Sequence, residues 1–132
     1  MNSQLQKPPS LGEQPAIDPE SLAELRGLPD GEGGELLNHL IELFLEDAPQ
    51  AIADLRQALA AADAPAIARL AHTIRGTGGY FGAHRFQALC GTIEVAGRTG
   101  DLTPVAGLLA CANRELQEVT AALNAERQLS HP

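Results

Sequence analysis

Aromatic residues and positive charge are both scarce in this sequence. Its 132 residues contain no tryptophan, one tyrosine and three phenylalanines. With so few rings, the chain offers no platform on which nucleic-acid bases could stack. Nine Lys and Arg oppose seventeen Asp and Glu, for a formal net charge of −8. An acidic chain repels nucleic acids and anionic membrane surfaces, so we expect neither as a partner.

Cysteine and long apolar runs are also few. Cys90 and Cys111 are too few for a disulfide framework, and no secretory signal precedes them. No apolar run reaches the roughly 18 residues that a membrane-spanning helix requires. We therefore expect a chain in the cytoplasm, with both thiols reduced and packed as small apolar groups.

Acidic residues are missing from one stretch, residues 64–93, although they are frequent elsewhere. This stretch contains Arg69, Arg75 and Arg85, so it carries a formal charge of +3 and the rest of the chain carries −11. A gap of this length can arise by chance. We favour the alternative, a locally positive surface that suits an anionic group.

Apolar residues recur at three- and four-residue steps, which is the period of an amphipathic helix. The sequence contains no strand pattern, and its 44% hydrophobic residues are mostly small or aliphatic. We predict an all-α fold, an antiparallel four-helix bundle with a short additional N-terminal helix. The predicted helices cover residues 19–26, 35–59, 64–81, 84–97 and 104–125.

Turn and capping residues set the boundaries of these helices. Asp18, Asp63 and Thr103 are predicted N-caps, because a proline follows each within two residues. Pro49 lies inside an apolar stripe that keeps its phase, so we predict one long kinked helix there. The domain organisation is then a flexible leader or linker at 1–16, a bundle at 17–126 and a frayed tail at 127–132.

One predicted helix places a histidine opposite its buried face. At 100° per residue, one side gathers the apolar positions, and His72, Gly76 and Gly79 lie on the solvent side with Arg75 flanking them. Glycine costs a helix about 1 kcal/mol relative to alanine. Bare backbone on an exposed face therefore indicates that another protein approaches it closely. The predicted buried positions are Ile67, Leu70, Ala71, Ile74, Gly78 and Phe81.

This arrangement favours phosphoryl chemistry at His72. A lone exposed histidine is usually an ordinary surface residue, but here Arg75 stands one turn away and can pair with phosphoryl oxygens. Imidazole is a nitrogen nucleophile that can accept a phosphoryl group covalently. The sequence has no P-loop, dinucleotide-binding or kinase motif, so a partner must bring the phosphoryl group and its metal.

The segment around His72 resembles the motif of the histidine-containing phosphotransfer (HPt) domains of bacterial multistep phosphorelays. That motif is His, two residues, Lys, Gly, then small residues up to an apolar residue and Gly. Segments 43–55, 89–94 and 98–101 are also similar to the family, so the likeness covers about 17–126. Two departures are Arg75 in place of lysine, and two glycines where serine or alanine is usual. The matching residues are His72-Thr73-Ile74-Arg75-Gly76-Thr77-Gly78-Gly79-Tyr80-Phe81-Gly82.

The resemblance implies that His72 is the phosphoacceptor and that Arg75 stabilises the phosphoryl group. His72 would exchange this group with the aspartate of a receiver domain, which supplies Mg²⁺, and the chain would need no cofactor. The chain would be a stoichiometric carrier without an ATP site, not an enzyme. The polar outer faces of the predicted helices favour a monomer. We expect either the C-terminal module of a hybrid sensor kinase, which can be membrane-bound, or a small free-standing protein that works with a separate histidine kinase. The expected binding residues are Arg69, Gly76, Gly79, Tyr80 and Gly82.

Other interpretations stay open. The chain could be an adaptor that binds receiver domains or another protein without carrying phosphate. Its histidines and cysteines are not at metal-ligand spacing, so we expect no metal site. We expect His84 to be a surface residue rather than a second acceptor. Glu94 either orients the imidazole of His72 or, as we favour, is an ordinary solvated carboxylate.

Overall fold

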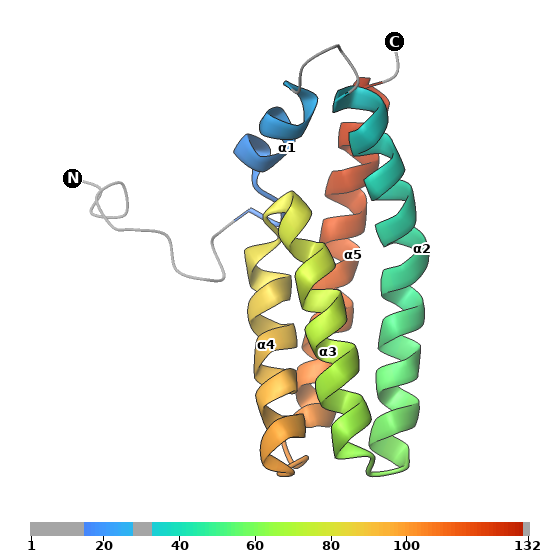
Figure 1. Cartoon of the computed structure of the whole chain (residues 1–132), viewed down its shortest axis with the longest axis vertical. Helices are drawn as coiled ribbons and strands as arrows, with labels where there is room; N and C mark the ends of the chain where they lie inside the picture. Colours follow the sequence, from blue (N-terminus) through green and yellow to red (C-terminus); the bar gives the residue numbers. More distant parts are fainter. Residues whose placement is uncertain (1–14, 28–32, 131–132) are drawn as a thin grey trace, which may run out of the picture.

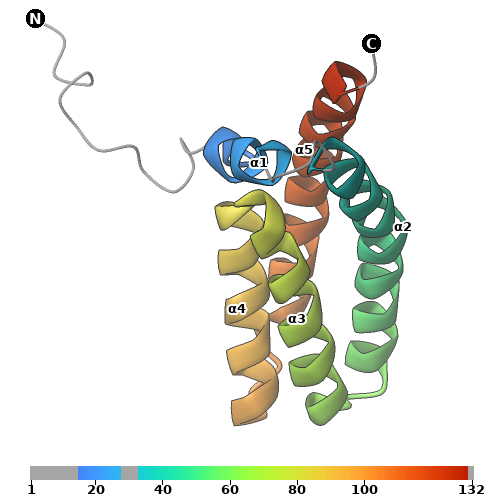
Figure 2. The same ribbon diagram turned by 45° about the horizontal axis from the view of Figure 1, so that its top comes forward.

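The computed structural model describes residues 15–27 and 33–130, and this part of the chain is helical without a strand. Helices α2 to α5 lie along the long axis of the molecule, and each runs antiparallel to the one before it (Figure 1). Helix α1 lies across one end of this bundle (Figure 2). The predicted fold is confirmed. The elements are α1 Pro19–Arg26, α2 Gly33–Ala60, α3 Ala64–Gly78, the 3-10 turn η4 Gly79–Phe81, α4 His84–Thr99 and α5 Val105–Ser130.

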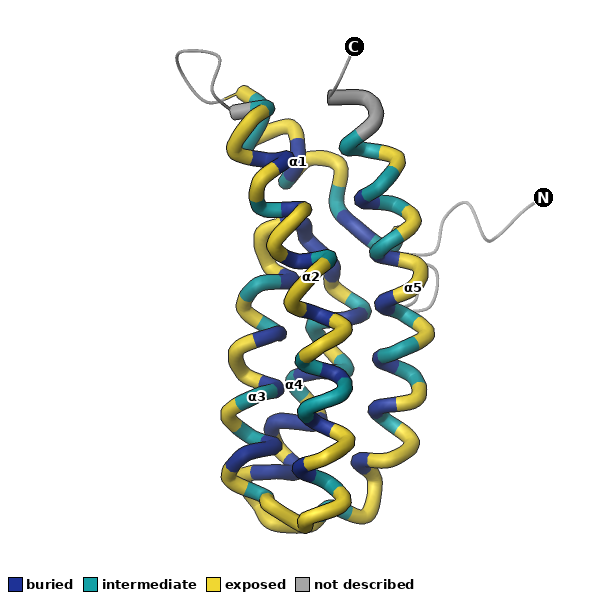
Figure 3. Tube along the Cα trace, turned by 90° about the vertical axis from the view of Figure 1, so that its right-hand side faces the viewer, coloured by how far each residue is buried: buried dark blue, intermediate teal, exposed yellow. Residues whose placement is uncertain are grey.

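Each long helix buries one stripe of its surface, so the dark segments in Figure 3 recur about once per turn and face inward. Phe44 of α2 lies edge-on to Phe81 of η4 and to Phe86 of α4, with ring centroids 5.4 and 5.9 Å apart. These three rings fill the end of the core beside α1. Aromatic pairs in this geometry add about 1 kcal/mol to the burial of their surface.

Capping residues mark the helix starts, and two of the three predicted caps, Asp18 and Asp63, are confirmed. Asp18 caps α1 by accepting a hydrogen bond from the Glu20 backbone N–H at 3.0 Å. Asp63 caps α3 by accepting from the Ala66 backbone N–H at 3.2 Å. The prediction of Thr103 as a cap is wrong, because α5 begins at Val105. The side-chain acceptor before α5 is Asp101, which accepts from the Thr103 N–H. Hydrogen bonds from Thr103 lower the pKa of Asp101.

Helix α2 agrees with the prediction, whereas the end of α5 differs from it. Helix α2 is unbroken across Pro49, so the prediction of a single helix is confirmed, while a local kink there stays a prediction. Helix α5 continues to Ser130, so residues 127–130 are helical where the sequence predicts a frayed tail. An ion pair at 2.9 Å between Arg26 of α1 and Glu126 ties this end to the bundle. Most of the predicted leader, residues 1–14, lies outside the described residues.

The link between α3 and α4 requires a glycine. Gly82 has φ +61°, a left-handed conformation that favours glycine. A Cβ at this position would lie 2.3 Å from the Cβ of Asp18. The Asp18 N–H also donates to the Phe81 carbonyl at 2.8 Å. Gly82 thus lets the start of α1 rest on the turn between α3 and α4.

No helix in the described ranges is both long and apolar enough to cross a membrane.

Candidate functional site around His72

Helix α3 presents His72 to solvent, as its periodicity predicts. Ile67, Ala71 and Ile74 are buried against the other helices. The side chain of His72 is 60% exposed, and Gly76 is exposed one turn further along. The capped start of α3 fixes where each residue of the helix lies. The predicted division of α3 into a buried and an exposed face is therefore confirmed, with Leu70 half-buried at its edge.

Helix α4 approaches α3 closely because it carries a glycine at the contact. A Cβ on Gly97 would lie 2.6 Å from the backbone nitrogen of Ala68 and 2.9 Å from the carbonyl oxygen of Ala64. Real Cβ atoms are not found so close to a neighbouring backbone, so this spacing requires Gly97. The close contact brings Glu94, about one turn earlier on α4, within reach of His72.

Glu94 is a buried carboxylate bonded to His72. Its residue is 4% exposed, and its Oε2 lies 3.0 Å from His72 Nδ1. The favoured expectation of a solvated side chain is therefore wrong. Glu94 directly follows the acid-free stretch, but α4 turns its side chain into the groove beside α3. The orienting role, the other interpretation of Glu94, has the contact that it needs.

This contact assigns the protons of the imidazole ring. A carboxylate can only accept, so Nδ1 carries the proton and donates it to Glu94. In a neutral ring Nε2 is then the nitrogen with a free lone pair. Arg75 Nη2 lies 3.4 Å from the same Nδ1. Since both atoms then carry hydrogens, Arg75 is an electrostatic neighbour of the ring and not a hydrogen-bond partner.

Two arginines balance the buried carboxylate. Arg75 Nε lies 3.2 Å from Glu94 Oε1, and Arg98 pairs with Glu94 Oε2 from one turn along α4. The Arg75 Nε contact is an ion pair without hydrogen-bond alignment, because this buried nitrogen has no bonded partner. With a neutral imidazole, the group sums to one positive charge. Sequence reasoning missed Arg98, although its i, i+4 spacing from Glu94 signals a helical ion pair.

The predicted binding residues divide into an exposed set near His72 and one buried residue, Gly82. Arg69, Gly76, Gly79 and Tyr80 are exposed on the same side of α3 and η4 as His72. Gly82 is buried, and its glycine serves the turn described above, so it does not belong to this surface. A Cβ on Gly76 would meet no atom within 4 Å. Nothing within the described chain therefore requires glycine at position 76.

Cys90 and His84 are two further candidate nucleophiles, and both lie on α4. Burial raises the pKa of the Cys90 thiol to about 12, although the nearby Arg75 guanidinium lowers it in part. A thiol with such a pKa has almost no thiolate at neutral pH. His84 is exposed at the first turn of α4. Over residues 15–27 and 33–130, no three His, Cys, Asp or Glu side chains gather as a metal site.

Comparisons with known proteins agree with this geometry. A family model described as "Hpt domain" matches residues 39–127. The chain is also similar to the crystal structure of histidine-containing phosphotransfer protein B (HptB) from Pseudomonas aeruginosa PAO1. The TM-score is 0.78 at 29% sequence identity, over 86% of this chain and 96% of that one. Among curated protein sequences, none matches this chain.

Proposed function

Because the chain belongs to the Hpt domain family, we propose that His72 is the residue that carries its phosphoryl group. Membership makes the chain a histidine phosphotransfer module of a phosphorelay, and Hpt proteins are phosphocarriers rather than enzymes. One observation supports His72 above all. Its exposed imidazole is held through Nδ1 by the buried Glu94, which leaves Nε2 as the nucleophile.

The transfer step that we propose is a direct displacement at phosphorus. Nε2 of His72 forms a bond to the phosphorus of an aspartyl phosphate as the bond to the aspartate oxygen breaks. The aspartate leaves as a carboxylate, and the reverse step returns the phosphoryl group to it. While Nδ1 keeps its proton, the phosphorylated ring is cationic. Glu94, one hydrogen bond away at 3.0 Å, compensates this charge.

Arg75 and Arg98 have a second role in this proposal. They neutralise Glu94 in the free chain, and their guanidinium groups are partly exposed beside His72. Guanidinium groups bind phosphoryl oxygens through paired hydrogen bonds, which lysine cannot reproduce. We therefore infer that Arg75 contacts the phosphoryl group on His72. The receiver domain would supply Mg²⁺, which neutralises the phosphoryl oxygens during transfer.

The exposed glycines fit the approach of a receiver. Hpt domains interact with receiver domains in phosphorelays. In-line transfer requires the receiver aspartate to come within bonding distance of His72, so the two backbones must approach closely. Gly76 is open on this face at the cost of helix stability. We propose that Arg69, Gly76, Gly79 and Tyr80 lie within the docking surface.

The wider setting of the chain is also part of the proposal. We infer a monomer in the cytoplasm that has no ATP site and that obtains its phosphoryl group from receiver domains. The sequence is compatible with a C-terminal module of a hybrid sensor kinase and with a free-standing protein that serves a separate kinase. A phosphotransfer profile against the receiver domains and kinases of the host separates these two settings.

Phosphotransfer to the purified chain tests the assignment of His72. Isolated receiver domains are labelled with radioactive acetyl phosphate and mixed with the chain. We expect label on the chain that acid removes and base does not, as for a phosphohistidine. The variant His72→Gln should accept none, whereas His84→Gln should accept as much as the wild type. Label on His72→Gln would show that another residue is the acceptor.

The same experiment separates the carrier from the adaptor alternative. An adaptor would bind receiver domains with equal affinity whether or not His72 is present, and it would accept no label from any of them. Binding measured by calorimetry for the wild type and His72→Ala, next to the transfer assay, distinguishes the two functions.

A further inference from the structure

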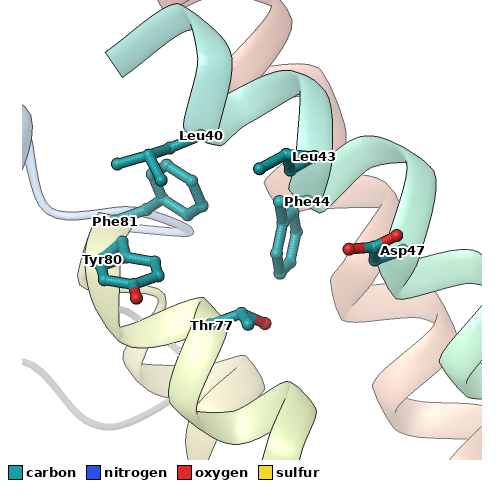
Figure 4. A pocket seen from close by; sticks show the side chains of 7 residues that line it. All are labelled: Leu40, Leu43, Phe44, Asp47, Thr77, Tyr80 and Phe81. Atoms are coloured by element: carbon teal, nitrogen blue, oxygen red, sulfur yellow. The ribbon is translucent and has the colours of Figure 1, made fainter. Parts of the chain in front are cut away.

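A groove between α2 and α3 lies beside the exposed face that carries His72. It consists of two adjoining depressions that share Asp47 of α2 and Thr77 of α3. Figure 4 shows the first of them, where side chains from α2 face those of α3 and η4. The second continues down the helices past Asp54, Arg69 and Thr73, the residue next to His72. The groove therefore runs alongside the phosphoacceptor helix.

The end of the groove near α1 is apolar. Phe44 and Phe81 are buried beneath it, and Leu43 and Tyr80 remain 42% and 53% exposed at its rim. Large apolar side chains left exposed around a depression mark a place where a partner buries an apolar side chain of its own. No other segment of the described chain covers Leu43 and Tyr80. This end of the groove can anchor a partner.

The other end of the groove carries charges of opposite sign on its two walls. Helix α2 has five acidic residues and no Lys or Arg between positions 33 and 55. Two of the five, Asp47 and Asp54, line the groove, whereas α3 contributes Arg69. Among the described ion pairs, none joins these residues, so their charges are available to a partner.

The size of protein interfaces extends the docking surface onto this groove. A specific interface buries about 800 Å² on each partner, a patch roughly 30 Å across. One helix with its side chains is only about 10 Å wide. A receiver that places its aspartate on His72 therefore also covers a neighbouring helix. The groove along α2 offers that receiver both an apolar anchor and a charge pattern.

We propose that this groove selects the receiver domain: it takes an apolar side chain of the receiver at its aromatic end and a Lys or Arg beside Asp47. The inference rests on the proposed function, because the occupant is the receiver that exchanges phosphoryl with His72. Asp47 is the determinant of choice, since it belongs to both depressions and separates the apolar end from the charged end. A receiver with an acidic residue at the facing position is repelled.

A charge reversal with a matched neighbour tests the role of Asp47. The probe is the isolated receiver domain, charged with acetyl phosphate, that transfers fastest to the wild-type chain. Asp47→Lys should lower kcat/KM for transfer about tenfold at 0.15 M salt. Glu46→Lys changes the net charge equally, but Glu46 is exposed and lines neither depression. This control should stay within about twofold of the wild type, because Glu46 lies about 100° around α2 from Asp47 and does not line the groove.

A second pair of variants tests the apolar anchor. Leu43→Ala should lower kcat/KM about tenfold, whereas Leu36→Ala, which is exposed outside both depressions, should change it less than about twofold. At 1 M salt the effect of Asp47→Lys should shrink, because the Debye length falls to about 3 Å, while the effect of Leu43→Ala should persist. Circular dichroism melting curves verify that all four variants fold.

The outcomes separate this inference from the proposed function. If the wild type accepts phosphoryl from no receiver, the proposed function is wrong and this inference falls with it. If the wild type transfers normally and both groove variants match their controls, only the groove inference is overturned. Equal losses in Asp47→Lys and Glu46→Lys would also overturn it, because a general field and not this groove would then be responsible.

Discussion

Replacing Glu94 by glutamine removes the buried negative charge beside His72 while it keeps the size of the side chain. The carboxylate is 4% exposed and lies 3.0 Å from His72 Nδ1. A glutamine can still accept a hydrogen bond from Nδ1–H, but it can also donate one to an unprotonated Nδ1. The change therefore separates the charge of Glu94 from its shape.

The structure gives the size of the expected effect. Two unit charges about 4 Å apart interact by about 4 kcal/mol at an effective dielectric constant of about 20. The side chain of His72 is 60% exposed, and two arginines already neutralise part of the carboxylate. We take half of that energy, about 2 kcal/mol, as the contribution to the transition state. Transfer from a receiver to Glu94→Gln should then be about thirtyfold slower.

Stability should respond differently from the transfer rate. The buried partner in this group is the carboxylate, whereas Arg75 and Arg98 have side chains that are 42% and 66% exposed. Without Glu94 the arginines can hydrate, so Glu94→Gln should change the free energy of unfolding by less than about 1 kcal/mol. Removing both arginines instead leaves a buried charge unpaired and should destabilise the bundle by about 3 kcal/mol.

Rapid-quench measurement of a single transfer from a labelled receiver gives the rate, and urea unfolding gives the stability. Imidazole ¹⁵N chemical shifts of His72 report which ring nitrogen carries the proton. We expect one tautomer in the wild type and a mixture in Glu94→Gln. The matched control is Glu115→Gln, which loses an ion pair with Arg85 between α4 and α5. A wild-type transfer rate in Glu94→Gln would refute the electrostatic reasoning.

Four further outcomes follow from the packing of the bundle. Gly76→Ala should stabilise the chain by about 1 kcal/mol in thermal melts, since the added Cβ would meet no atom within 4 Å. Gly76→Glu should slow phosphotransfer at least about tenfold, and an unchanged rate would contradict docking at this face. Gly97→Ala should lower the free energy of unfolding in urea by about 2 kcal/mol, because the added Cβ forces α3 and α4 apart. Gly91→Ala is the control and should not destabilise the chain, because its Cβ would lie at an ordinary contact distance, 3.5 Å, from Arg75 Cδ. Iodoacetamide at pH 8 should modify the half-buried Cys111 but not Cys90, as peptide mass spectrometry can verify. The Cys90 thiol has a pKa of about 12 in the folded chain, so it loses its proton at lower pH when the chain is unfolded. The free energy of unfolding should therefore fall as the pH rises from 9 towards 12.

Local rules were sufficient for the helices and for the exposed face of α3. Asp18 and Asp63 cap helices because a short carboxylate before a proline satisfies free backbone N–H groups wherever it occurs. The 3.6-residue period placed His72 opposite Ile67 and Ile74, since that relation depends only on the helix itself. The family resemblance also rests on sequence motifs, above all on the residues around His72.

The same local rules do not predict which residues of the other helices contact His72. The sequence predicts a solvated Glu94 and a Gly82 within the docking surface. In the structure Glu94 is buried against His72, and Gly82 lies beneath the start of α1. Periodicity fixes the side of a helix on which a residue lies, but not which residue of another helix faces it. That choice depends on the rotation and axial shift of the packed helices.

The sequence by itself thus determined the helices, the exposed imidazole and the positive stretch around it. Only the tertiary structure decided that a buried carboxylate holds that imidazole and that a partly apolar groove with charges of both signs runs beside it. For the carboxylate, the physical reason is the contact of Gly97 with the backbone of Ala64 and Ala68, which sets α4 so close to α3 that Glu94 reaches His72. The groove depends in the same way on how α2 packs against α3.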